Sequence, residues 1–69
     1  MSVREQNFER MLADVRSNYR LILQKMEKLK AEGKTKSATY HQLMGNKMMY
    51  QNMLTMYKSY GLIDKNEEI

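Results

Sequence analysis

FERMLADVRSNYRLILQKMEKL, residues 8–29, places apolar side chains at alternating steps of four and three residues. The repeat consists of Phe8, Leu12, Val15, Tyr19, Ile22, Met26 and Leu29. Because this spacing brings its members to one side of an α-helix, it predicts a helix that packs against other helices. The pattern carries no catalytic chemistry, so it indicates a protein that acts by contact.

Length and composition predict one small all-α domain that needs support beyond its own core. The chain has 69 residues, and a core of this size rarely supplies more than about 3–5 kcal/mol. It contains no Pro and three Gly, so few residues interrupt a helix. It also lacks Cys, which excludes disulfides and thiolate metal sites and is compatible with a reducing, cytoplasmic location. Oligomerisation is the remaining source of stability.

The first helix is expected over about residues 3–32. Ser2 and Glu5 have the spacing of a capping box, in which each side chain accepts a hydrogen bond from a backbone N–H at the helix start. Gly33 can adopt the left-handed conformation that ends a helix. The polar residues 33–37 then form a short connection to a second helix.

The second helix is expected over about residues 38–60. Its start has two candidate N-caps, because Thr39 and Gln42 form another capping box and Ser37 lies two residues earlier. Its end is expected at Gly61, in a Schellman-type stop.

The two helices are expected to form an antiparallel hairpin, a single domain over residues 1–63, followed by a flexible charged tail over residues 64–69. The second helix has the wider apolar surface, which covers about 160° of its circumference. That surface consists of Leu43, Met49, Tyr50, Met53, Leu54, Met56, Tyr57 and Tyr60. Since one partner helix cannot cover it, we expect a homodimer that forms a four-helix bundle.

Two residues of the second helix have alternative interpretations. Asn46 falls near the centre of the apolar surface. It could pair with its symmetry mate in the dimer and fix the register, or lie at the wetter end of the bundle near the loop. Gly45 marks either a close approach of two helices or a tolerated surface glycine.

The side chains that catalysis requires are scarce. His41 is the only histidine, and without Cys the chain has no Cys/His nucleophile pair and no His-rich metal site. Glu5 and Glu9 form a carboxylate pair at helical spacing, but capping already explains Glu5. The glycines are isolated, so no phosphate-binding loop occurs. We therefore expect a non-enzymatic protein without cofactor, metal or small-molecule substrate.

Basic residues gather around the end of the first helix and the connection that follows it. They are Arg20, Lys25, Lys28, Lys30, Lys34 and Lys36, and with two acidic residues they give a net charge of +4 over residues 20–36. Such a cluster can neutralise phosphates, so an accessory protein that binds nucleic acid is one interpretation. The alternative is a solvated face with lysines at a helix C-terminus.

A second candidate surface lies outside the main apolar surface of the second helix. Tyr40, Met44 and Met48 project to one side of it, and methionine-rich surfaces adapt to partners of varied shape. This patch favours a protein partner. The expected function is that of a small interaction or regulatory protein, such as an adaptor, an inhibitor or an accessory subunit.

The sequence does not predict a membrane protein. No apolar run approaches the roughly 18 residues that span a bilayer, and residues 2–5 do not resemble the start of a signal peptide. The polar face of the first helix carries both signs of charge, which is not typical of a helix that lies on an anionic membrane. We therefore expect a soluble, cytoplasmic protein.

Overall fold

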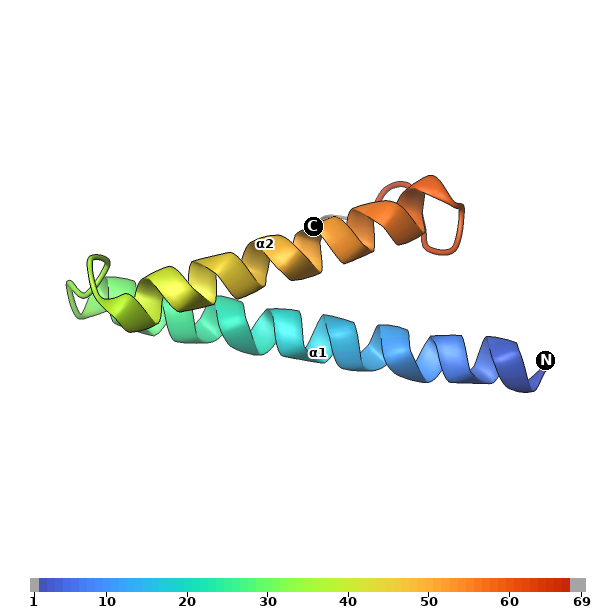
Figure 1. Cartoon of the computed structure of the whole chain (residues 1–69), viewed down its shortest axis with the longest axis horizontal. Coiled ribbons are helices and arrows are strands. Elements are labelled where there is room, and N and C mark those ends of the chain that lie inside the picture. The colour runs from blue at the N-terminus through green and yellow to red at the C-terminus, as the bar shows by residue number, and fades with distance from the viewer. Residues whose placement is uncertain (1, 68–69) are drawn as a thin grey trace.

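The computed structural model describes residues 2–67 and consists of two helices joined by a short loop. α1 spans Val3–Ala31 and α2 spans Ala38–Ser59, and the two pack antiparallel as a hairpin about 46 Å long (Figure 1). The helices diverge toward the end that carries Val3, away from the loop (Figure 1). The prediction of an all-α hairpin is confirmed.

A serine caps the N-terminus of each helix. Ser2 caps α1 in a capping box, in which its Oγ accepts from Glu5 N–H at 3.2 Å and the Glu5 carboxylate accepts from Ser2 N–H at 3.4 Å. Ser37 caps α2, and its Oγ accepts from Tyr40 N–H at 3.1 Å. Of the two candidate starts of α2, the structure therefore has the one at Ser37.

Both helices end in a Schellman motif with glycine in the left-handed conformation. Gly33 and Gly61 each have φ +74°. After α1, Lys34 N–H donates to Leu29 C=O at 2.8 Å. After α2, Leu62 N–H donates to Tyr57 C=O at 2.9 Å. These bonds satisfy carbonyl groups that would otherwise lack partners, and they fix the lengths of both helices.

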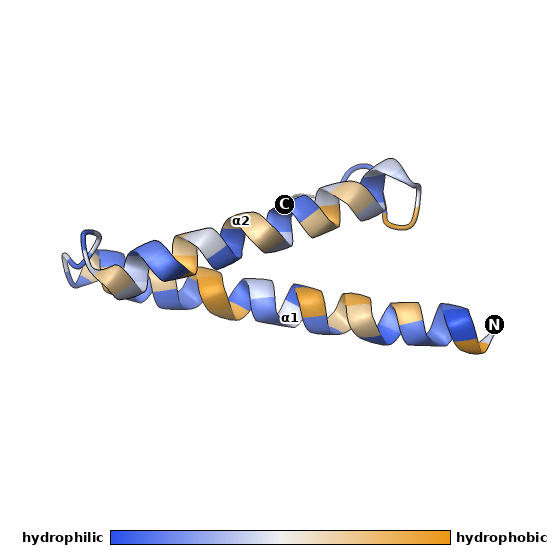
Figure 2. Cartoon of the chain, in the orientation of Figure 1, coloured by the Kyte–Doolittle hydropathy of each residue, from blue (hydrophilic) through white to orange (hydrophobic). Residues whose placement is uncertain are grey.

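The hairpin core is small and lies between the middle of α1 and the second half of α2. Its buried centre consists of Leu12, Val15, Leu54 and Ile63, and Phe8, Tyr19, Tyr50, Met53 and Tyr57 pack against it. The rings of Phe8 and Tyr57 meet edge to face, with centroids 5.4 Å apart. The apolar residues of α1 lie mainly along the edge that faces α2 (Figure 2), and buried Ile22 and Met26 continue this edge toward the loop.

The segment after α2 turns back and packs on both helices as far as Glu67. Ile63 is 8% exposed and belongs to the core. The Glu67 carboxylate accepts hydrogen bonds from the Arg16 guanidinium, and its backbone carbonyl accepts from Lys58 Nζ at 2.6 Å. The sequence predicts a flexible tail over residues 64–69; within it, Glu67 makes these contacts with both helices, whereas residues 64–66 are exposed, and residues 68 and 69 lie outside the described part of the chain.

Leu54, at 2% exposure, is the most deeply buried of the core side chains, so its truncation tests the packing of the hairpin. We expect Leu54→Ala to lower the free energy of unfolding by about 2–5 kcal/mol, because it removes buried methyl groups and leaves a cavity. Urea denaturation followed by circular dichroism measures this, with the exposed neighbour Thr55→Ala as the matched control. Equal effects of the two substitutions would contradict the described core.

Two of the three glycines allow a pair of substitutions whose expected effects on stability have opposite signs. Gly61→Ala should lower the free energy of unfolding by about 1–2 kcal/mol, because an L-residue is strained in the left-handed conformation. Gly45 lies within α2, and a Cβ atom there would meet nothing within 4 Å. Gly45→Ala should therefore raise the free energy of unfolding by up to about 1 kcal/mol. A loss on Gly45→Ala would instead reveal a close approach that the hairpin itself does not contain.

Candidate interaction surface

An apolar stripe on α2 faces solvent. It consists of Met49, Met53, Met56 and Tyr60, called here the methionine stripe. Met49, Met56 and Tyr60 are 48%, 58% and 76% exposed, and only Met53 packs partly into the core. The steps of four, three and four residues between its members place them on one side of the helix, beside the side that contacts α1. The stripe therefore has the pattern of a packed helix face without a partner in the hairpin.

The patch of Tyr40, Met44 and Met48 lies on the other flank of α2. Met44 and Met48 are 40% and 57% exposed, whereas Tyr40 is half-buried. This flank also carries Lys58, which contacts Glu67. α2 thus has apolar surface on both sides of its contact with α1.

The residues predicted to pack divide into three groups. Leu12, Val15, Ile22, Met26 and Leu54 are buried in the hairpin. Phe8, Tyr19, Leu29, Leu43, Asn46, Tyr50, Met53 and Tyr57 are half-buried, and Met49, Met56 and Tyr60 are exposed. The hairpin therefore buries or half-buries thirteen of the sixteen predicted residues, from both helices, and leaves the other three exposed.

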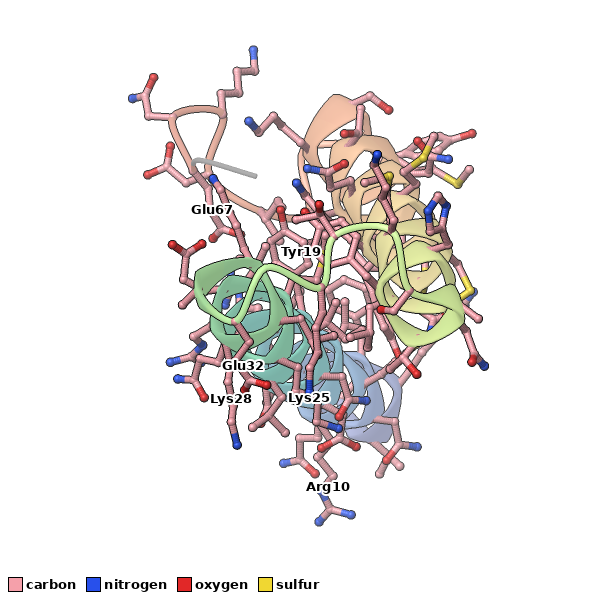
Figure 3. All side chains as sticks on the ribbon, turned by 90° about the vertical axis from the view of Figure 1, so that its left-hand side faces the viewer. Arg10, Tyr19, Lys25, Lys28, Glu32 and Glu67 are labelled. Carbon is pink, nitrogen blue, oxygen red and sulfur yellow. The ribbon has the colours of Figure 1, made fainter. Side chains whose placement is uncertain are left out.

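The sequence pattern does not predict the polar contacts between the side chains of α1 and α2. Gln51 Nε2 donates to the Tyr19 hydroxyl at 3.1 Å, and Asn18 Nδ2 lies 3.5 Å from the Tyr50 hydroxyl. Tyr19 lies between the two helices, below Glu67 (Figure 3). These bonds let two tyrosines contribute ring area to the seam while their hydroxyl groups reach polar partners at its edges.

The basic residues near the loop do not share one face. At 100° per residue, Lys25 and Lys28 of α1 lie about 60° apart on one side of the helix, and Arg20 and Lys30 follow at further steps of about 80°, so that the four residues spread over about 220°. Lys25 and Lys28 extend from the side of α1 opposite Glu67 (Figure 3). Lys34 is occupied by an ion pair with Glu32, at 3.0 Å between Nζ and Oε2. The basic residues of α1 are therefore spread over much of its circumference instead of forming one stripe.

The ion pair at the loop changes the titration of Glu32. The hydrogen bond and the charge of Lys34 hold the pKa of Glu32 below its ordinary value of 4.5, with a smaller contribution from the charge of Lys28, and they outweigh the opposing effect of desolvation. A carboxyl group with a lowered pKa stabilises the fold at neutral pH, and this contribution is lost as the pH falls through the lowered pKa.

The surface hollows of the hairpin are larger than the sequence suggests but open to solvent. One, about 500 Å³, lies between the start of α1 and the turn after α2, beside Arg4, Phe8 and Leu62. Another, about 390 Å³, lies at the loop end beside Lys28, Leu29 and Leu43. Neither encloses a ligand in the way of typical small-molecule sites.

No cluster of three or more His, Asp or Glu side chains suited to a metal ion occurs within residues 2–67. His41, in the first turn of α2, is exposed, and Glu5 is engaged in the capping box. Over the same residues, neither helix is long and apolar enough to cross a membrane.

The comparisons with known proteins give no relatives. No protein-family model, no curated protein and no solved structure matches this chain. Its function must therefore be argued from its own surface.

The Glu32 titration can be measured directly. We expect its carboxyl group to titrate below 4.5 by NMR and to return toward 4.5 in Lys34→Gln, which removes the main cause of the shift. The control is Lys36→Gln, a loss of the same charge two residues along the loop. A Glu32 midpoint that does not respond to Lys34→Gln, or that responds equally to both substitutions, would contradict the specific pair.

Proposed function

We propose that this chain is a small, non-enzymatic interaction protein that acts as a homodimer through contacts with another protein, as an adaptor, inhibitor or accessory subunit. The observation that carries the proposal is the solvent-exposed methionine stripe, whose members Met49, Met56 and Tyr60 are about half exposed or more in the hairpin. An apolar surface of this kind on a soluble chain marks a site of association.

The small core supports self-association as the use of this stripe. Within residues 2–67 the buried apolar side chains number six, namely Leu12, Val15, Ile22, Met26, Leu54 and Ile63. A second hairpin placed on the stripe would cover Met49, Met56 and Tyr60 and extend that core. Two hairpins packed in this way form a four-helix bundle.

The flank of Tyr40, Met44 and Met48 then provides a surface for a different protein. It stays outside an interface formed by the methionine stripe, because it lies on the other side of the contact between α1 and α2. Its methionines are flexible and polarisable, so they can fit an apolar groove or helix of a partner.

Binding of nucleic acid is less well supported as a function. Basic residues clustered on one face are the footprint of a nucleic-acid-binding domain, whereas those of α1 spread over about 220° of its circumference at 100° per residue, and Lys34 is paired with Glu32. The outcome that would favour it is binding that falls steeply with salt and disappears when Lys25, Lys28 and Lys30 are neutralised.

The two sides of α2 are tested by a pair of matched substitutions. Met56→Glu puts a charge into the methionine stripe, and we expect it to convert a dimer into a monomer in sedimentation equilibrium at micromolar concentration. Met48→Glu adds the same charge at a methionine of nearly equal exposure on the other flank, 57% against 58%. It should leave the dimer intact and abolish capture of the partner protein from a native lysate.

The unsubstituted chain provides the decisive control. A stably folded monomer at micromolar concentration would refute the homodimer, and with it the account of the methionine stripe. A dimer that survives Met56→Glu but not Met48→Glu would assign the two sides of α2 the other way round.

A further inference from the structure

The methionine stripe is spaced so that it can match a second copy of itself. Its members follow each other at steps of four, three and four residues, an order that reads the same in both directions along the helix. A two-fold interface uses the same patch on both copies, so a patch that matches its own reversal can form such an interface. We infer that two copies pair their α2 helices antiparallel, so that Met49 packs on Tyr60 and Met53 packs on Met56 of the second copy; this rests on the proposed function.

In this register, each member of the methionine stripe packs against another member of the stripe on the second copy. The two-fold axis passes between Met53 and Met56, which lie within the overlap of the two α2 helices, residues 50–59, and Met49 meets Tyr60 directly at each end of that overlap. Asn46 falls beyond the overlap, toward the loop, where its half-buried amide keeps its contact with water. The competing parallel arrangement would place Asn46 against its symmetry mate and Tyr60 against Tyr60.

The charge distribution favours the antiparallel arrangement. Residues 20–36 carry six basic and two acidic residues, whereas residues 1–19 carry three of each sign and residues 58–67 carry two of each. The loop end of the hairpin is therefore strongly positive and the opposite end is neutral. A parallel pair would bring two positive loop ends together, whereas an antiparallel pair separates them.

The distance between the two loop ends determines how strongly their positive charges repel each other. Packed helices lie about 8–10 Å apart, so loop ends side by side repel within about one Debye length, roughly 8 Å at physiological salt. In the antiparallel pair, each Ser37 lies about 17 residues from the axis, so the two loop ends are separated by roughly 50 Å along the helices at 1.5 Å per residue. Repulsion across that distance is screened.

The tail leaves the stripe free for this contact. Ile63 and Glu67 pack on the side of the hairpin that carries Arg16 and Lys58. On the helical circumference of α2, Lys58 lies nearly opposite Met56, at an offset of 200° from two steps of 100°. The second copy therefore docks without displacing the tail.

Disulfide cross-linking of a chain without native Cys tests the arrangement. Met49→Cys and Tyr60→Cys are made in separate full-length chains with tags of different length, mixed and oxidised. The mixed disulfide should dominate, because the two positions face each other in the antiparallel pair. Each variant alone should cross-link poorly, since two copies of position 49 are then about 16 Å apart along the helix and a disulfide needs Cα atoms within about 7 Å.

The control repeats the experiment with Met48→Cys and Ser59→Cys, which have the same separation of 11 residues on the other flank of α2. This pair should give no mixed disulfide.

Efficient cross-linking of Met49→Cys alone and Tyr60→Cys alone would show a parallel pair and overturn the inference while the homodimer stands. A dimer without cross-links at either position would also overturn it, whereas a monomeric unsubstituted chain would refute the proposed function itself.

A second measurement leaves the stripe unaltered. Thr35→Cys places a spin label in the exposed loop, away from the methionine stripe. We expect a distance between labels near 50 Å in the dimer, from the rise per residue of α2. A distance of about 10–20 Å, close to the spacing of packed helices, would overturn the antiparallel arrangement.

Discussion

The contact of Leu54 with the middle of α1 is the constraint on which the rest of the hairpin depends. Leu54 and Leu12 are the two most deeply buried side chains of the core, at 2% and 3% exposure. Their packing fixes the register of α2 against α1, and the register decides which side of α2 is left over. Because α2 is apolar on more than one side, satisfying Leu54 leaves Met49, Met56 and Tyr60 exposed. The exposure of the methionine stripe is therefore a direct consequence of the core.

The elements of the fold with local causes could be predicted from the sequence. The capping box of Ser2 and Glu5, the stops at Gly33 and Gly61 and the buried side of α1 each depend on residues within a few positions of each other. The sequence does not distinguish Ser37 from Thr39 as the start of α2, because both residues can cap a helix. The exposed part of the second apolar pattern was also predictable as a pattern, although the sequence does not say which members the hairpin buries.

The contacts between distant residues could not be predicted. Ile63 enters the core and Glu67 reaches Arg16 across 51 positions, and neither belongs to a periodic pattern. A segment of mixed charge after a helix usually extends into solvent, so composition predicts a flexible tail there. The one available signal was a large apolar side chain, Ile63, two residues after a helix stop. The positions of the lysines could not be predicted either. Residues that are close together in the sequence can point to different sides of a helix.

The position of Ile63 in the core has a consequence for the synthesis of the protein. The core joins residue 12 to residue 63, so it cannot close until nearly the whole hairpin has left the ribosome. At about 5–20 residues per second, the 32 residues between the end of α1 and Ile63 take roughly 2–6 s to add. During those seconds α1 presents its apolar edge without α2 beside it, although most of the stability of a helix in a protein comes from packing of its apolar face. The nascent chain is therefore most exposed to chaperones, and to premature association with other chains, in the interval before its last turn is made.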